Sequence, residues 1–188
     1  SADKNFGTSD VLEHKANNTS GNAGTHRITL LKFDLSEMKD KKIADVQLAF
    51  NVFEMEQINT LREILVYGCD HYAWEENEVT YKTIGGQEEL ITSVFISGKG
   101  IKYIDVTEYV KKAYERGEDL IAFYLEGNPA SMYRTRIDSS NKVDGVAPCL
   151  DVVYGDTTFV TKLKYKGENP WDVAMKAVTT WLDRWDDI

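Results

Sequence analysis

The chain has 188 residues, of which 42% are hydrophobic and 28% are charged, a composition typical of a folded globular protein rather than a disordered one. The formal net charge of −9 argues against nucleic acid and against anionic membranes as general partners. No apolar run approaches the roughly 20 residues of a membrane-spanning helix, and the first residues do not resemble a signal peptide.

Several short stretches alternate apolar and polar residues, which predicts β-strands. In residues 46–52, for example, Val46, Leu48 and Phe50 share one face. Similar stretches occupy residues 28–35, 62–71, 102–106, 120–126 and 149–154, and turn-rich intervals separate them. The pattern predicts an all-β fold, an antiparallel β-sandwich of the jelly-roll kind.

Two helices are predicted among the strands. Residues 106–117 carry apolar side chains at helical spacing, with Thr107 placed to cap the first turn and Gly117 placed to end the last one. A C-terminal amphipathic helix is predicted over residues 169–186. Its apolar stripe consists of Trp171, Ala174, Ala177, Val178, Trp181, Leu182 and Trp185.

The predicted elements suggest one domain and an extension. We expect a β-sandwich over residues 1–155, followed over residues 156–188 by an edge strand or linker and the C-terminal helix. Neither end of the chain resembles a natural terminus, so we expect a segment of a longer protein in which the helix leads to a further domain. Cys69 and Cys149 lack metal-ligand spacing, and both a single disulfide and two separate thiols remain open.

The stretch WEENEVTY, residues 74–81, gathers three glutamates behind a tryptophan. Two such acids suit glycoside hydrolysis, or a metal site, only if the fold holds them at a defined separation. The simpler interpretation is structural. Trp74 packs against the end of the sandwich, Glu76 ties down the loop by satisfying backbone donors, and Glu75 and Glu78 point into solvent.

Six motifs in order resemble DNRLRE-type domains, the β-sandwich modules that include carbohydrate-binding module family 96. They are NFGT, THRITLLKFDLS, IADVQLAFNV, WEENEVTY, IDVTEYV and APCLDVVY, and together they cover residues 5–154. The chain departs from the family pattern at Tyr81, where a tryptophan is usual, and it shows no counterpart of the family's first strand. The resemblance implies a sandwich module, some of whose members bind anionic polysaccharide through basic residues in a groove.

The candidate ligand-binding residues come from the early and late parts of the chain. The resemblance assigns Arg27 to the arginine before the family's strand motif, Lys32 to the basic residue within it, and Lys15 to the lysine of an early strand. From the residues themselves, Arg134 and Arg136 share one face of a later strand, and Tyr133 lies on the other. Both stretches carry a small local excess of positive charge. Because early and late strands often neighbour each other in a sandwich, we expect one groove lined by Lys15, Arg27, Lys32, Tyr133, Arg134 and Arg136.

Arginine grips a carboxylate with paired planar donors, lysine adds charge, and an aromatic ring can stack on a sugar. The expected function is therefore a non-catalytic module that binds an acidic polysaccharide such as alginate and keeps an attached lyase or glycoside hydrolase near its substrate. We expect it to be secreted or displayed on a bacterial surface. No catalytic residue and no metal ligand is assigned. No cofactor is required, although a structural calcium ion is compatible with the many loop acids.

Three alternatives stay open. As a polysaccharide lyase domain, the chain would use Tyr133, Arg134 and Arg136 on a uronate. As a structural or adhesive spacer, it would bind no glycan. Because the whole chain is acidic, a neutral glycan also remains open as the ligand.

Overall fold

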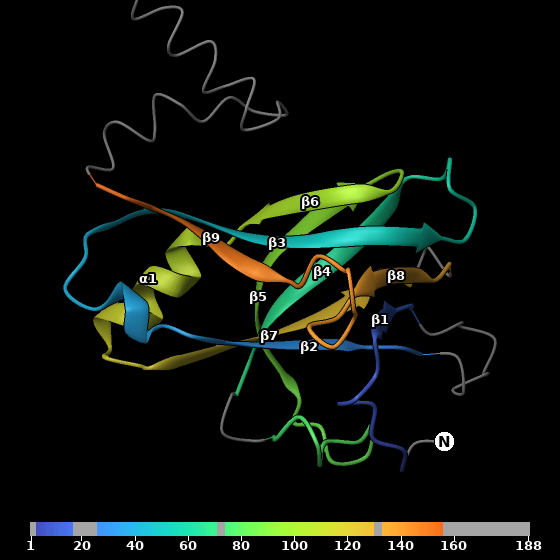
Figure 1. Cartoon of the computed structure of the whole chain (residues 1–188), viewed down its shortest axis with the longest axis horizontal. Helices are drawn as coiled ribbons and strands as arrows, with labels where there is room; N and C mark the ends of the chain where they lie inside the picture. The colour runs from blue at the N-terminus through green and yellow to red at the C-terminus, as the bar shows by residue number, and fades with distance from the viewer. Residues whose placement is uncertain (1–2, 17–25, 71–73, 130–132, 156–188) are drawn as a thin grey trace, which may run out of the picture.

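The computed structural model describes residues 3–16, 26–70, 74–129 and 133–155, and these form two antiparallel sheets packed face to face (Figure 1). The first sheet has the order β1-β8-β3-β6, with β9 also paired to β3. The second has the order β2-β7-β4-β5. The first sheet comprises β1 (Val11–His14), β3 (Ile43–Met55), β6 (Gly100–Asp105), β8 (Thr135–Asp138) and β9 (Cys149–Tyr154). The second comprises β2 (Thr29–Asp34), β4 (Arg62–Cys69), β5 (Gln87–Ile96) and β7 (Leu120–Gly127).

The predicted antiparallel β-sandwich is therefore confirmed. A 3-10 turn, η2 (Ser36–Met38), follows β2, and the helix α1 (Thr107–Glu115) lies at the same end of the sandwich (Figure 1). The predicted C-terminal helix and the strand or linker before it fall outside the described residues.

The long strand β3 organises the first sheet. Its residues Gln47 to Val52 pair with β6 on one edge, whereas its other edge pairs first with β9 and then with β8. Both of the latter pairings contain a register shift, as expected where one strand must follow two partners. Alternate residues of β3, among them Leu48 and Phe50, point into the core.

The sandwich interior is a single apolar cluster between the sheets. Its largest fully buried side chains include Phe50, Phe123, Leu35 and Ile137. A second, smaller cluster lies on the opposite face of the second sheet, where Trp74 packs with Cys69, Ala122 and Tyr124. The loop over residues 74–84 therefore covers the outside of the second sheet. The prediction that Trp74 packs against the end of the sandwich is wrong, because Trp74 lies on the outer face of this sheet.

The helix α1 is correctly placed by the sequence, but its first turn differs from the prediction. Val106 is the N-cap and makes no side-chain cap bond. The hydroxyl of Thr107 instead donates to Asp105 Oδ1 (2.6 Å) and accepts from the main-chain N–H of Val46 (3.0 Å), so it joins the helix to β3. Gly117 ends the helix as predicted, with a φ of 76° that favours glycine.

Two other expectations are corrected. The strand β5 was not predicted, because it contains two consecutive glutamates and only weak alternation. The disulfide alternative is wrong, since Cys69 and Cys149 are both free. Cys69 is buried, and Cys149 is exposed on β9.

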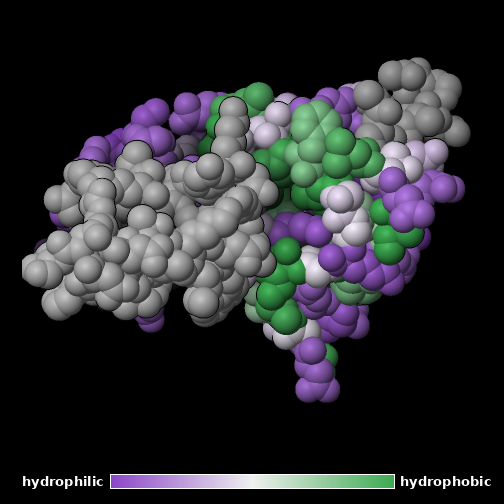
Figure 2. All heavy atoms as spheres, turned by 90° about the horizontal axis from the view of Figure 1, so that it is seen from above, coloured by the Kyte–Doolittle hydropathy of each residue, from purple (hydrophilic) through white to green (hydrophobic). Residues whose placement is uncertain are grey.

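Outside the core, apolar side chains remain exposed. Ile101, Tyr103 and Val146 border a shallow depression of about 190 Å³ on the first sheet. The face seen in Figure 2 carries apolar side chains in patches, with polar side chains between and around them. Among the described residues, no helix is long and apolar enough to cross a membrane.

His14 is a buried histidine that points into the sandwich from β1. It is 2% exposed, and neither ring nitrogen has a hydrogen-bond partner among the described residues. Burial first, and then the positive charge of Arg62, lower the pKa of His14 from 6.5 to about 4. In the unfolded chain the same imidazole takes up a proton at its ordinary pKa, so acid favours the unfolded state.

Lowering the pH from about 7 to about 5 is expected to reduce the free energy of unfolding by about 2 kcal/mol through His14, because the unfolded chain binds a proton that the folded protein excludes. Urea unfolding at the two pH values measures the loss. The variant His14→Leu should lose less stability over the same interval. An equally steep loss in this variant would show that His14 is not responsible.

Candidate functional site

The first part of the candidate site is a charged patch on the outer face of the first sheet. It lies opposite the core, since Leu12 and Ile137, which alternate with its members along β1 and β8, pack inside. We call it the arginine surface. It consists of Lys15, Arg27, Arg134 and Arg136 together with Glu13, Glu54 and Glu56.

Arg136 is the centre of this surface. The strand register places it directly between Glu13 on β1 and Glu54 on β3. Its Nε donates to Glu13 Oε1 (2.6 Å), and its Nη1 donates to Glu54 Oε2 (2.9 Å). These two hydrogen bonds raise the pKa of Arg136 above its ordinary value. The guanidinium plane is thus fixed across three strands before any ligand arrives.

Arg134 repeats the arrangement two residues earlier. Its guanidinium lies 3.4 Å from Glu56 and 3.5 Å from Glu54, measured from Nη2 to the nearest carboxylate oxygen. Its main-chain N–H donates to Glu56 Oε2 (2.8 Å), and this bond is the main reason that the pKa of Glu56 is lowered. Lys15 Nζ lies 3.9 Å from the same carboxylate.

A buried arginine supports the patch from below. Arg62, at the start of β4, is only 2% exposed. Its Nη1 donates to the main-chain oxygen of Arg134 (2.6 Å) and to the hydroxyl of Thr135 (3.2 Å). The ring of Tyr133 lies against it, with 5.4 Å between Cζ and the ring centroid. Arg62 therefore fixes the backbone that carries Arg134, and Tyr133 belongs to this support.

The charges of the arginine surface nearly cancel. Four basic side chains face three carboxylates, which leaves a small positive excess in a chain whose net charge is −9. All these ion pairs are partly open to solvent: the side chains of Arg134 and Arg136 are 30% and 31% exposed, and Arg27 is 48% exposed. Such pairs exchange partners at little cost, so an incoming carboxylate can replace a glutamate.

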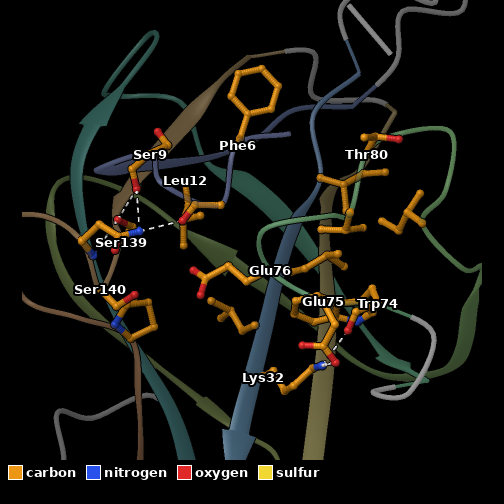
Figure 3. Close-up of a pocket in the computed structure, with 18 of the residues that line it drawn as sticks. Phe6, Ser9, Leu12, Lys32, Trp74, Glu75, Glu76, Thr80, Ser139 and Ser140 are labelled. Atoms are coloured by element: carbon orange, nitrogen blue, oxygen red, sulfur yellow. Dashed lines mark hydrogen bonds and ion pairs between the residues drawn. The ribbon is translucent and has the colours of Figure 1, made fainter. Parts of the chain in front are cut away.

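The second part of the candidate site is a cavity of about 900 Å³ beside β2, which we call the β2 groove. Residues 4–9, the loop over 74–84 and the loop over 139–148 form its walls, and β2 forms its floor (Figure 3). Apolar side chains such as Leu12, Leu30 and Phe33 line much of it. A concave site of this size is large enough for a ligand of several rings.

Lys32 lies in the β2 groove and not on the arginine surface. Its Nζ lies 4.4 Å from the ring centroid of Trp74, donates to the main-chain oxygen of Trp74 (2.7 Å) and pairs with Glu75 (3.7 Å). Figure 3 shows Lys32 beside Trp74 and Glu75, with Ser9 and Ser139 on another side of the groove. The ammonium group of Lys32 is therefore already held by the protein.

The walls of the groove are held by polar contacts between distant segments. Asn5 Nδ2 donates to the main-chain oxygens of Glu76 (2.8 Å) and Val79 (2.7 Å). Asp138 holds the loop over 139–148, since it accepts from Lys142 and from the main-chain N–H of Val146 (3.0 Å). Glu76 was predicted to hold the loop through its carboxylate. In the structure it holds the loop through its main-chain oxygen, which accepts from Asn5. The side chains of Glu75, Glu76 and Glu78 are exposed.

Four of the six candidate residues predicted from the sequence lie together in the structure. The structure brings Lys15, Arg27, Arg134 and Arg136 together, places Tyr133 beside their support, and separates Lys32 from them. It also adds residues that the sequence did not indicate. The glutamates that pair with the arginines, Glu13, Glu54 and Glu56, can be identified only once the strand register is known. In the sequence, nothing distinguishes Arg62 from a surface arginine. Among the described residues, no three His, Cys, Asp or Glu side chains are grouped to hold a metal ion.

Comparison with known protein families identifies a match over most of the chain. The family model described as carbohydrate-binding module family 96 matches residues 1–153. No curated protein matches the chain.

The variant Asn5→Asp should lower the free energy of unfolding by about 2–3 kcal/mol, because it removes two hydrogen bonds and sets a carboxylate against two carbonyl oxygens. Asn77→Asp is the matched control, because Asn77 is exposed and lies in the loop over 74–84 that Asn5 holds. Thermal unfolding of both variants measures the difference. Equal melting temperatures would show that Asn5 does not hold this wall.

Proposed function

Because the chain belongs to carbohydrate-binding module family 96, we propose that its ligand is an acidic polysaccharide, alginate first among them, bound through the arginine surface. The family membership itself makes the chain a carbohydrate-binding module, a class without catalytic activity of its own. The proposal adds the charge of the ligand and the residues that bind it.

The observation that carries the proposal is the convergence of basic side chains from distant parts of the sequence. Lys15 and Arg27 are paired with each other through their main chains. Arg136 lies on the neighbouring strand β8, and Arg134 immediately precedes that strand. A guanidinium held in a fixed plane binds a carboxylate with two parallel hydrogen bonds. Uronate residues along a polysaccharide present such carboxylates at regular intervals.

Binding on this surface is expected to be a partner exchange. A uronate carboxylate that reaches Arg136 competes with Glu13 and Glu54, which already accept from it. Affinity for any single uronate is then modest, and salt weakens it because the pairs are partly exposed. The acidic chain as a whole offers a polyanion no long-range attraction, so recognition depends on these short-range contacts.

A module of this kind acts by proximity. Attached to a polysaccharide lyase or a glycoside hydrolase, it holds the enzyme near an insoluble or extended chain and raises the effective substrate concentration. We propose that such an enzyme forms the adjacent domain, and that the whole protein is secreted or held on the cell surface. The large ligand then engages the module repeatedly, which compensates for weak individual contacts.

Replacing Arg136 by Ala is expected to weaken alginate binding by about 10- to 100-fold, the usual range for a lost charge-assisted contact. Isothermal titration calorimetry on the 188-residue chain measures the change. Arg116→Ala is the matched control, because Arg116 also pairs with a glutamate, Glu118, but belongs to the end of α1. Unchanged affinity in Arg136→Ala would place the ligand elsewhere. Release of unsaturated, ultraviolet-absorbing ends would instead support the lyase alternative.

Replacing Glu54 by Gln is expected to strengthen binding by about 2- to 5-fold, because it removes one competing carboxylate and raises the positive excess of the surface. The same titration, repeated at low and high salt, measures both the gain and its screening. A neutral glycan as ligand would show no gain. Weaker alginate binding in Glu54→Gln would contradict the exchange of partners at Arg136.

A further inference from the structure

We infer that the β2 groove is a second part of the glycan site, which takes sugar units by their hydroxyl groups and ring faces and not by their carboxylates. The inference rests on the proposed function, because it assumes a polysaccharide bound at the arginine surface. It adds a separate site and a different chemistry of recognition.

The two parts are continuous through Arg27. Its Nε lies 3.6 Å from Glu13 on the arginine surface, and the same side chain lines the β2 groove. Its neighbour His26 also lines the groove, where Nδ1 lies 2.8 Å from the hydroxyl of Tyr81. A polymer that passes Arg27 therefore leaves the outer face of the first sheet and enters the space between β1 and β2.

The groove does not favour a carboxylate. Lys32 is held by Trp74 and Glu75, as Figure 3 shows, and Glu76 also lines the groove. Over the whole lining, the bases Lys4, Arg27 and Lys32 are matched by the acids Asp34, Glu75 and Glu76. With no positive excess, the groove selects a ligand by polar hydrogen bonds and shape and not by charge.

Two kinds of contact are on offer to a sugar. Phe6 and Tyr81 line the groove and are 56% and 48% exposed. Lys4 Nζ lies 4.9 Å from the centroid of the Phe6 ring, and the rings of Tyr81 and His26 meet in a T-shaped contact, so the exposed remainder of each ring is what a pyranose ring would contact. Ser140 and Asn141 lie in the wall, where the Ser140 hydroxyl can bond a sugar hydroxyl. Asn141 Nδ2 already donates to the main-chain oxygen of Gly7 (2.7 Å), so its Oδ1 is the atom that would accept from a sugar. The large apolar share of the lining suits the C–H faces of a sugar ring.

The floor of the groove adds main-chain groups. The N–H of Leu35 bonds to Asp119 (2.8 Å), which continues the β2–β7 ladder and sets its alternation. By that alternation, Leu30, Lys32 and Asp34 direct their main-chain N–H and C=O groups away from β7. Among the described strands, none pairs with this edge of β2. Sugar hydroxyls, which both donate and accept, suit such an edge.

The inference predicts an affinity that depends on ligand length. A uronate disaccharide occupies only the arginine surface, whereas a long uronate oligosaccharide also reaches the groove. The double variant Phe6→Ala/Tyr81→Ala should weaken binding of the long ligand about tenfold and leave the disaccharide unaffected. Phe95→Ala is the matched control, because Phe95 is 63% exposed but lies on β5, outside the groove lining.

Calorimetry with both ligands distinguishes the two proposals. Long-ligand affinity that is unchanged in the double variant overturns the groove site and leaves the arginine surface standing. If neither ligand binds the parent protein, the proposed function fails and the groove site with it. Unfolding temperatures within the spread of the control variant show that the double variant is folded.

Amide hydrogen exchange provides a second, independent readout. The main-chain amides of Leu30 and Lys32 should exchange fast in the free protein and slow down with the long ligand, but not with the disaccharide. If both amides are already protected in the free 188-residue chain, a polypeptide segment fills the edge of β2, and the groove is not a sugar site.

Discussion

The proposed binding face of this protein depends on one cross-strand row, in which Arg136 lies between Glu13 and Glu54. Three strands that are far apart in the sequence contribute one side chain each, and antiparallel pairing sets them side by side. The row does two things at once. It holds β1, β8 and β3 in register through their charges, and it keeps the guanidinium in a fixed orientation toward solvent. The same glutamates that orient the arginine also compete with any acidic ligand, so orientation and affinity are opposed at this position.

Much of the fold was visible in the sequence, since alternation is strong wherever one strand face is buried. Strands such as β3, β4 and β7 follow directly from that alternation, and α1 follows from its helical spacing and from Gly117. The strand β5 could not be found this way, because most of its first half is solvent-exposed and Glu88 and Glu89 interrupt the alternation. The position of Trp74 could not be found either. The sequence pattern around a tryptophan is the same whether its ring enters the main core or, as here, covers the outside of a sheet.

The site shows where sequence reasoning stops. Strand alternation places Arg134 and Arg136 on one face, and topology then brings Lys15 and Arg27 to them. Lys32 belongs to a strand of the other sheet, and its side chain turns to the outer face of that sheet, where Trp74 and Glu75 hold it. Composition alone does not separate Lys32 from Lys15, Arg27, Arg134 and Arg136, because all five are basic residues in or near strands. What separates them is which sheet each strand joins, and that is decided by long-range pairing.

The edge of β2 with which no described strand pairs also bears on how the protein behaves at high concentration. An unpaired strand edge is a template on which another chain can add, and such edges are a common start of aggregation. In β2 the charged side chains of Lys32 and Asp34 alternate with apolar Leu31 and Phe33 along this margin, and gatekeepers of this kind discourage edge-to-edge growth. In the inferred glycan complex, the sugar would contact the same backbone groups that a second copy of the chain would need, so an occupied groove would also hinder edge-to-edge association.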